Sequence, residues 1–322
     1  MGTNILVFIR VHSWLKTKMK NSKHLTGIDH LSKGDILSIL DRAQGYADAL
    51  ARGKKVKPIL AGKTVITMFF ENSTRTRLSF EMAAHRLGAN VINWDMETSS
   101  LKKNESFLDT VLTVGAMKPD AVIVRHNEYE APVFMAKRMD CAIINAGDSW
   151  REHPTQALLD ALTMRQAKGE IEGRTVTICG DIAHSRVAAS NIILLSKMGA
   201  NIRVIAPDFL MPQKFSVSGI ETFTSMEGGL PGSDVIMMLR NQKERMDPSR
   251  IPDDATFHKQ FGLTRERLNL APGAFVMHPG PINRGVEIAD DVADDPASSL
   301  ILKQVTNGIP VRMAVLDKLL SS

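Results

Sequence analysis

Short apolar runs that resemble β-strands alternate with segments of helical length along most of this chain, and this alternation constrains the fold more than any other feature. The first half reads as strand 63–71, helix 74–88, strand 89–95, helix 106–117, strand 120–126, helix 130–139 and strand 141–148. Strands that alternate with helices of this length are joined by right-handed crossovers into a parallel sheet with helices on both faces. The pattern therefore predicts a doubly wound α/β domain.

A long helix-like segment at 153–169 leads into a second series of the same kind. It contains strand-like runs at 174–181, 200–208, 234–240 and 274–281 and a helix-like segment at 186–199. We predict two doubly wound parallel-sheet α/β domains, with a C-terminal helix that packs back on the first. The expected boundaries are 23–160 plus the C-terminal helix 306–322 for the first domain, and 161–305 for the second.

The composition is typical of a globular protein, and the distribution of charge argues against a nucleic-acid partner. Of the 322 residues 43% are hydrophobic, and the net charge of +5 is spread without any run of five or six like charges. A nucleic-acid-binding stripe is therefore not indicated. The two cysteines, Cys141 and Cys179, lie in apolar contexts, which favours buried, reduced thiols in a cytoplasmic protein.

Residues 1–22 are predicted to be a poorly determined extension, with Met19 as a candidate alternative start. The longest apolar run there, Ile5 to Ile9, is shorter than the roughly seven to fifteen residues of a signal peptide's hydrophobic region. No segment approaches the roughly eighteen apolar residues of a membrane span. We therefore expect no membrane association.

The segment ENSTRTRLSFE, residues 71–81, places many hydrogen-bond donors at a turn from strand to helix. The first amides of a helix and its dipole favour an anion. The hydroxyls of Ser73, Thr74 and Thr76 add donors, and the planar guanidinium of Arg75 can grip a phosphate. The alternative is that Ser73 only caps the helix and that the arginines are solvated. This segment alone supports both interpretations equally.

Polar residues also follow the next strands of the same predicted sheet. Arg125 lies at the end of the third strand, and His153 and Gln156 lie three residues apart, on one helical face, after the fourth. Ligands of open parallel sheets bind beyond the carboxyl ends of the strands. A lone histidine or arginine is usually structural, but the convergence of these ends is better evidence of a site than any single residue.

Three loops of the second half carry further candidates. DIAHSR ends at Arg186 and RNQKER begins at Arg240, each directly after a strand. Either could be a salt-bridged surface loop, but two such arginines opposite an anion site would suit a second acidic group such as a dicarboxylate. The Pro- and Gly-rich HPGPINRG, residues 278–285, follows a buried strand and can present backbone carbonyls to a ligand.

Several motifs of cofactor and metal sites are missing from the sequence. There is no C-x-x-C, no H-E-x-x-H and no G-x-x-x-x-G-K-[ST], so neither zinc nor a P-loop nucleotide is indicated. CGDIAHSRVAAS opens a βαβ unit with Asp208 near the end of the next strand, but it lacks the glycine triplet of dinucleotide sites. A dinucleotide-binding dehydrogenase is therefore only weakly indicated.

Five motifs, in this order and spacing, resemble the transcarbamylase family: STRTRLSFE, HPTQ, GDIAHSR, RNQKER and HPGPINRG. The resemblance runs from about residue 24 to the C-terminus. STRTR and HPTQ are common to transcarbamylases, whereas RNQKER and HPGPINR resemble the aspartate enzymes. The ornithine enzymes have a cysteine-bearing HCLP where this chain has residues 278–281. The resemblance implies transfer of the carbamoyl group of carbamoyl phosphate to the α-amino group of L-aspartate, in pyrimidine synthesis, without metal or cofactor.

The resemblance also implies a role for each matched residue. Carbamoyl phosphate is expected at Ser73, Thr74, Arg75, Thr76, Arg125, His153, Gln156, Gly280 and Pro281. L-Aspartate is expected at Lys103, Arg186, Arg240 and Gln242. The implied catalytic residues are Arg75, Thr76, Lys103, Arg125 and His153. Of these, Thr76, Arg125 and His153 would stabilise the oxyanion of the tetrahedral intermediate.

SSLKKNES, residues 99–106, resembles the family's loop that reaches into a neighbouring subunit's site in a trimer, with Lys103 at the position of the catalytic lysine. Asn104 stands where glycine is usual, and asparagine tolerates positive φ better than most residues. Ser106 stands where threonine is usual, and the matching loop serine is either Ser99 or Ser100. By itself this stretch would be interpreted as a surface loop. The resemblance implies a homotrimer with shared active sites.

Two rival hypotheses remain at this point. One is a transcarbamylase that acts on another amine, such as ornithine. The other is a catalytically silent homologue that serves as a partner of another pathway enzyme, against which the presence of every matched residue argues. Whether a regulatory chain or a dihydroorotase partner binds stays open.

Overall fold

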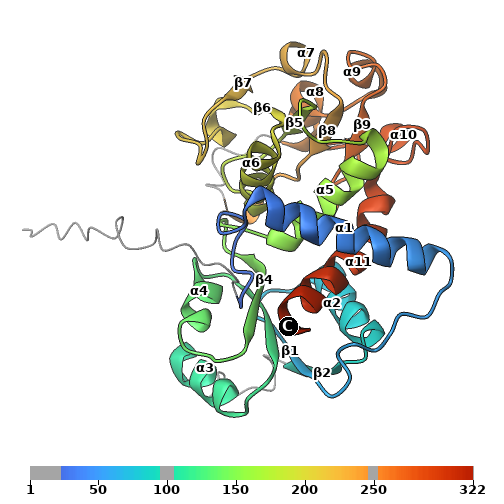
Figure 1. Cartoon of the computed structure of the whole chain (residues 1–322). Helices are drawn as coiled ribbons and strands as arrows, with labels where there is room; N and C mark the ends of the chain where they lie inside the picture. The colour runs from blue at the N-terminus through green and yellow to red at the C-terminus, as the bar shows by residue number, and fades with distance from the viewer. Residues whose placement is uncertain (1–22, 95–104, 246–252, 322) are drawn as a thin grey trace, which may run out of the picture.

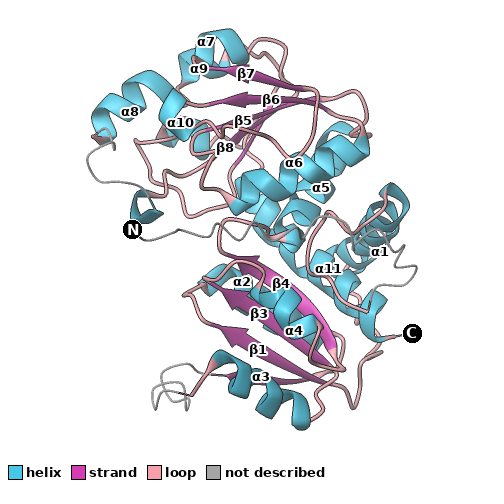
Figure 2. Ribbon diagram, turned by 90° about the vertical axis from the view of Figure 1, so that its left-hand side faces the viewer, coloured by secondary structure: helices cyan, strands magenta, loops and turns pink. Residues whose placement is uncertain are grey.

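The chain folds into two halves, each built on a parallel β-sheet (Figures 1 and 2). The computed structural model describes residues 23–94, 105–245 and 253–321. The predicted N-terminal extension, residues 1–22, therefore lies outside the described residues. The two parallel-sheet halves confirm the predicted fold class.

The first half is a four-stranded parallel sheet in the order β2-β1-β3-β4. Its strands are β1 (Thr64–Phe69), β2 (Asn90–Trp94), β3 (Ala121–His126) and β4 (Ala142–Asp148). Its crossover helices are α2 (Thr74–Arg86), α3 (Phe107–Ala116) and α4 (Ala131–Ala136). Every strand and crossover helix predicted for this half is present, within a few residues of the expected bounds.

Helices cover both faces of this sheet, as the buried strand residues show. Val65 and Ile123 belong to the large core shared with α1, α2 and α11, whereas their neighbours Ile66 and Val122 pack in a separate core with α3 and α4. Successive side chains of a strand point to opposite faces. Strands buried on both sides explain the nearly continuous apolar runs in the sequence.

The second half is a five-stranded parallel sheet in the order β7-β6-β5-β8-β9. Its strands are β5 (Thr175–Cys179), β6 (Asn201–Ile205), β7 (Ile220–Phe223), β8 (Val235–Met238) and β9 (Phe275–Met277). Its helices are α6 (Arg186–Met198), α7 (Met226–Gly229), α8 (Asp254–Phe261), α9 (Arg265–Leu268) and α10 (Asp290–Ala293). The edge strand β7 was not predicted, because Ile-Glu-Thr-Phe has too few apolar residues to stand out.

Three long helices join the halves: α1 (Lys33–Ala51), α5 (Pro154–Lys168) and α11 (Ile301–Leu320). In Figure 1, α11 returns from the second half and lies beside α1 and α2, which confirms the predicted packing on the first half. It begins earlier than the predicted 306, because Gly308 and Pro310 are accommodated inside the helix. The predicted boundary between residues 160 and 161 falls inside α5, and the division into two domains there stays a prediction.

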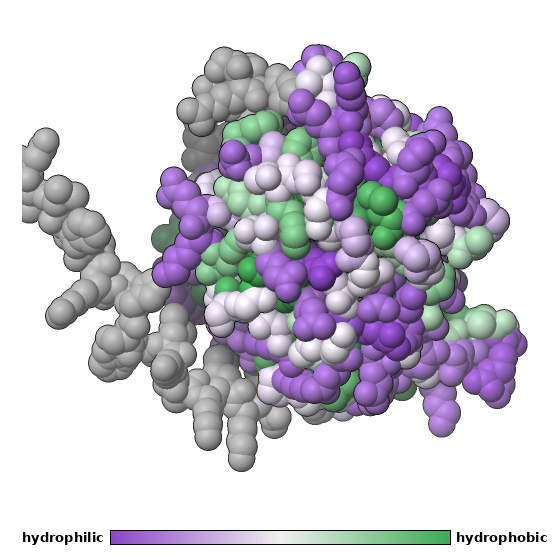
Figure 3. Space-filling model, turned by 90° about the horizontal axis from the view of Figure 1, so that it is seen from above, coloured by the Kyte–Doolittle hydropathy of each residue, from purple (hydrophilic) through white to green (hydrophobic). Residues whose placement is uncertain are grey.

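Local signals in the sequence explain several of these elements. Ser32 and Asp35 cap α1 reciprocally, each side chain accepting an amide N–H of the other residue. Cys141 and Cys179 are both free and buried, as expected. No described helix is both long enough and apolar enough to cross a membrane. Seen from above the second half, the surface is mostly hydrophilic with scattered hydrophobic residues (Figure 3).

Candidate functional site

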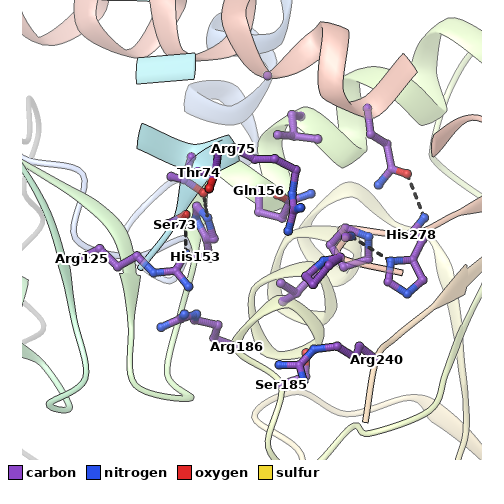
Figure 4. Close-up of a pocket in the computed structure, with 18 of the residues that line it drawn as sticks. Ser73, Thr74, Arg75, Arg125, His153, Gln156, Ser185, Arg186, Arg240 and His278 are labelled. Carbon is purple, nitrogen blue, oxygen red and sulfur yellow. Dashed lines mark hydrogen bonds between the residues drawn. The ribbon is translucent and has the colours of Figure 1, made fainter. Parts of the chain in front are cut away.

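A cleft of about 630 Å³ lies between the two halves (Figure 4). Three helices start at it, because α2, α5 and α6 each follow a strand whose carboxyl end faces the cleft. Helix N-termini carry unpaired amide donors and the positive end of the helix dipole. Their convergence makes the cleft a place for anions before any charged side chain is considered.

The side chains of the cleft reinforce this electrostatic preference. Six arginines line it, and Glu71 is the single acidic residue among the described lining residues. The arginines are Arg75, Arg125, Arg186, Arg240, Arg245 and Arg312. The site is therefore suited to a ligand that carries several negative charges.

The structure brings every predicted site residue that it describes to this one cleft. These residues are Ser73, Thr74, Arg75, Thr76, Arg125, His153, Gln156, Arg186, Arg240, Gln242, Gly280 and Pro281. Lys103, Asn104 and the candidate serines Ser99 and Ser100 lie outside the described residues. The role of each residue stays a prediction, while their convergence is a property of the fold.

Ser73 does not cap α2 with its side chain, so the simple capping interpretation is wrong. Its hydroxyl oxygen instead accepts a hydrogen bond of 3.2 Å from Nη1 of Arg125, at the end of β3. Arg77, by contrast, is exposed and faces Glu81 on its own helix, as a solvated arginine would. The start of α2 therefore presents its amides to the cleft rather than to a serine cap.

His153, directly before α5, is a buried neutral imidazole. Burial lowers its pKa well below the ordinary value, and the charges of Arg125, Arg312 and Arg186 lower it further. Its Nε2 lies 3.4 Å from the hydroxyl of Thr76, and its Nδ1 has no hydrogen-bond partner among the described residues. A neutral imidazole can donate an N–H without carrying a charge into the site.

Arg125, at the end of β3, is a largely buried cation of the cleft. Burial and the charge of Arg186 together lower its pKa to about 10, although Glu71 opposes the shift. It stays protonated at neutral pH, with Nε 3.1 Å from Oε2 of Glu71. Because water screens such a charge poorly, Arg125 can act strongly on an oxyanion placed beside it.

The loop after β9 supplies a different kind of group. Gly280 has a φ of +69°, and a Cβ there would lie 3.2 Å from the guanidinium of Arg75. The positive φ favours glycine here, and a larger residue would also require the side chain of Arg75 to shift by a few tenths of an ångström. The Gly280–Pro281 peptide bond is cis. The two residues bring backbone carbonyls, which only accept hydrogen bonds, beside the arginine-rich wall.

On the opposite wall, Arg186 begins α6 and is only 7% exposed, so the surface-loop interpretation is wrong for it. Its Nη1 donates 3.1 Å to the carbonyl of Ser149, and its Nη2 donates 2.7 Å to Glu71. Gln242 is held by two further contacts: its amide N–H donates to Asp181, and its Nε2 donates 2.8 Å to the carbonyl of His184.

The charged cleft residues that were not assigned from the sequence are Glu71, Arg245 and Arg312. Glu71 follows β1 and lies 3.1 Å from Arg125, 2.7 Å from Arg186 and 3.8 Å from Arg245. Burial opposes its ionisation, but the charges of Arg186 and Arg125 outweigh burial and lower its pKa. Glu71 and Arg245 stand inside the quoted motifs ENSTRTRLSFE and RNQKER, whereas Arg312 stands in none of them. In the sequence, the acidic Glu71 just before the arginine-rich segment 73–77 is the signal that could have marked it as a site residue.

No group of three or more His, Cys, Asp or Glu side chains that could hold a metal ion occurs among the described residues. The prediction that the chain needs no metal or cofactor is not tested by this observation. The chemistry that the arrangement offers is electrostatic: preorganised donors around an anion, a neutral imidazole, and acceptors on one side.

Comparisons with known proteins agree with this geometry. The family described as aspartate/ornithine carbamoyltransferase matches twice, with its carbamoyl-P binding domain at residues 23–166 and its Asp/Orn binding domain at residues 172–319. An aspartate carbamoyltransferase catalytic subunit of Cereibacter sphaeroides is 54% identical over 299 residues, covering 92% of this chain and 93% of that protein.

Solved structures show the same fold. Aspartate transcarbamoylase from Trypanosoma cruzi, in complex with carbamoyl phosphate, has a TM-score of 0.82 and 31% identity, covering 91% of this chain and 94% of its own. Ornithine carbamoyltransferase from Pyrococcus furiosus has a TM-score of 0.83 and 26% identity, covering 92% and 96%. The family matches and the relative at 54% identity decide the assignment. The chain belongs to the aspartate/ornithine carbamoyltransferase family.

Proposed function

We propose that this chain transfers the carbamoyl group of carbamoyl phosphate to the α-amino group of L-aspartate, giving N-carbamoyl-L-aspartate and phosphate, in de novo pyrimidine biosynthesis. The observation that carries the proposal is one cleft with six arginines and three helix N-termini, divided between two facing walls. Such a cleft suits two anionic substrates side by side. The relatives named as aspartate carbamoyltransferases favour this reaction over others of the family.

Carbamoyl phosphate would occupy the first wall. Its phosphate would lie at the start of α2, among the amides and hydroxyls of residues 73–76 and the guanidinium of Arg75. Its carbonyl oxygen would face Thr76, Arg125 and His153. Its NH₂ group would donate to Gln156 and to the carbonyls of Gly280 and Pro281. Every polar group of the substrate would then have a partner of matching chemistry.

L-Aspartate would occupy the second wall, with its two carboxylates at Arg186, Arg240 and Gln242 and with Lys103 of a neighbouring chain beside it. Its neutral amino nitrogen would attack the carbonyl carbon, forming the C–N bond and an oxyanion. The C–O bond to phosphate would then break, and the phosphate would leave with a proton from the amine. Donors preorganised around the oxyanion lower the barrier because its charge is largest near the transition state.

The test of this function is direct. Purified protein should form N-carbamoyl-L-aspartate and phosphate from the two substrates without added metal. L-Ornithine in place of L-aspartate should give no detectable product, since a second ammonium group would face the arginines of the second wall. Activity that a chelator abolishes, or activity with ornithine alone, would contradict the proposal. A protein with no activity would support the catalytically silent alternative.

We further propose a cytoplasmic homotrimer whose active sites are each completed by Lys103 of a neighbouring chain. Catalytic subunits among the relatives support an oligomeric assembly. In a closed trimer, each loop 99–106 would serve the next chain in one direction around the ring. Regulatory chains and a dihydroorotase partner are not part of this proposal.

A subunit-mixing experiment tests the shared site. Lys103→Ala and Arg186→Ala chains should each be nearly inactive alone, because every site carries a defect. In a hybrid trimer that contains both chain types, one site of the three would combine the intact Lys103 with the intact Arg186. The purified hybrid should therefore recover about one third of wild-type specific activity. Activity that stays at the parents' level would mean that Lys103 serves its own chain, or none.

A further inference from the structure

Behind the cleft, a buried carboxylate that does not line it accepts hydrogen bonds from three side-chain amides. Asp160 lies in α5, one turn after Gln156, and is fully buried. It accepts hydrogen bonds from Nε2 of Gln156 at 2.9 Å and from Nε2 of Gln304 at 2.8 Å, both at Oδ1. Its Oδ2 accepts from Nδ2 of Asn191 at 2.9 Å. The three amides come from α5, α11 and α6, so Asp160 stands where helices of both halves meet.

An ionised carboxylate accepts hydrogen bonds and cannot donate them, so it determines which way a neighbouring amide points. The Nε2 of Gln156 is turned toward Asp160, which leaves the carbonyl Oε1 as the group that Gln156 offers to the cleft. Without this constraint, a terminal amide could present either its NH₂ or its oxygen. Asp160, which lies outside the cleft, thus determines the orientation of the Gln156 amide.

Asp160 also acts on the opposite side of the pocket. Gln304, held by Asp160 through its Nε2, accepts the backbone N–H of His278 through its Oε1 at 2.8 Å (Figure 4). Nδ1 of His278 accepts the N–H of Gly280 at 2.8 Å, and its Nε2 lies 3.0 Å from Oε1 of the buried Glu287. This chain of contacts fixes the loop whose carbonyls face the cleft.

The hydrogen-bond partners of Asp160 and the nearby Arg312 stabilise its ionised form. Burial raises its pKa, and the three amides and the buried guanidinium of Arg312 favour the ionised form, so that the pKa is about 6. At neutral pH the carboxylate is therefore ionised and acts as an acceptor. The acceptors on both sides of the pocket, Oε1 of Gln156 and the carbonyls of Gly280 and Pro281, then need a donor from the ligand.

We propose that Asp160 is a positioning residue that makes the cleft select an acyl phosphate bearing an NH₂ group over one bearing a methyl group. The inference rests on the proposed function, because it takes carbamoyl phosphate as the ligand. A methyl group in place of NH₂ would leave acceptors on both sides without a donor. Enzymes discriminate strongly against ligands that lack a hydrogen-bonding group for which the site is built.

The experiment uses a matched pair of stable ligands: phosphonoacetamide, which carries the carboxamide NH₂, and acetonylphosphonate, which has a methyl group in its place. Calorimetry measures the dissociation constant of each for the wild type and for Asp160→Leu, which is similar in size but has no acceptor. The wild type should prefer the amide. In Asp160→Leu the ratio of the two constants should fall about tenfold, because Gln156 is free to turn.

Two control variants separate positioning from general damage. Thr163→Val removes a hydrogen bond of 2.9 Å from Asn307 at the same α5–α11 interface, one turn away, and should leave the ratio unchanged. Asp160→Asn should also keep the ratio close to that of the wild type. Its remaining oxygen can still accept from both glutamines, and the contact that is lost is the one with Asn191, which does not line the cleft.

An unchanged ratio in a folded Asp160→Leu protein, or an equal fall in Thr163→Val, would overturn the proposal. If Asp160→Leu does not fold, neutron diffraction from wild-type crystals locates the deuterium atoms of Gln156 directly. Deuterons of Nε2 on the side of Asp160 support the proposal, and the reverse orientation overturns it. Failure of the carbamoyl transfer assay in the wild type would remove the proposed function, whereas the two phosphonates would still report on the orientation of Gln156.

Discussion

Glu71 and Glu152 are two carboxylates that each contact residues of both halves of this molecule. We call Glu71, at the cleft, the front carboxylate and Glu152, behind the cleft, the rear carboxylate. At the cleft, Glu71 from the first half pairs with Arg186 and Arg245 of the second half and also with Arg125. Behind the cleft, Glu152 accepts the amide N–H of Ile28 at 2.6 Å and the hydroxyl of Ser190, in α6, at 3.2 Å.

The difference appears in the acidity of the two groups. The pKa of Glu71 is lowered because its arginines outweigh the effect of burial. Burial and the nearby Asp29 raise the pKa of Glu152 to about 7, and Arg151 and the N–H of Ile28 only partly oppose the shift. Glu71 is therefore one carboxylate among several cations of the cleft, whereas burial dominates the surroundings of Glu152.

The largest effect is expected on kcat, for the cleft residues that would contact the reacting atoms. Arg125→Ala or His153→Ala should lower kcat by about 10² to 10³, with a much smaller change in the affinity for carbamoyl phosphate. The oxyanion exists fully only near the tetrahedral state, so these donors act mainly on the transition state. Steady-state kinetics with both substrates varied measures the two effects separately.

Arg77→Ala is the matched control for this prediction, since Arg77 is an exposed arginine near the start of α2, outside the cleft. Its rates should equal those of the wild type. A loss of affinity for carbamoyl phosphate with kcat unchanged in Arg125→Ala would mean that Arg125 binds substrate and transition state equally and is not an oxyanion donor.

On the second wall, the expected effect is on aspartate. Arg240→Ala should raise the KM for L-aspartate at least about tenfold while leaving the affinity for carbamoyl phosphate close to wild type. Arg203→Ala provides the control, because Arg203 belongs to the same half but pairs with Glu221 away from the cleft. If Arg240→Ala leaves the KM for aspartate unchanged, the assignment of the dicarboxylate site is wrong.

Removing the front carboxylate should strengthen the binding of simple anions. Glu71→Gln removes one negative charge from the midst of Arg125, Arg186 and Arg245. Inorganic phosphate should bind the variant about fivefold more tightly at low ionic strength, and salt should reduce the difference. Calorimetric titration at two salt concentrations tests this. Weaker binding would show that Glu71 serves mainly to orient its arginines.

The contrast between front and rear also shows what a sequence can reveal. The front residues stand at the ends of strands, in positions that periodicity predicts, and the parallel topology brings those ends together. Arg186 was recognisable as a candidate for this reason, even though its burial was not. The strand β7 was missed because an exposed edge strand needs few apolar residues.

The pairing of charges could not be read from the sequence. Glu71 and Arg186 are 115 positions apart, and Glu152 and Ile28 are 124 apart. Nothing local in the sequence indicates that Ser73 accepts from Arg125 instead of capping α2. Such contacts depend on how two sheets are placed relative to each other, which propensity and periodicity do not determine.

The smallest predicted effect concerns the rear carboxylate and the pH dependence of stability. Because the folded-state pKa of Glu152 is raised from 4.5 to about 7, its protonation stabilises the fold. That contribution is fully present below about pH 4.5 and is lost as the pH rises through about 7.

Glu152→Gln lacks this contribution, so the unfolding free energy of the variant relative to the wild type should rise by about 1 kcal/mol per pH unit between about pH 5.5 and 6.5. Denaturant unfolding at several pH values measures the difference, and the exposed Glu170→Gln controls for the loss of one negative charge. A flat difference across this range would mean that Glu152 is already ionised throughout it. Front and rear carboxylates would then differ in their partners but not in their acidity.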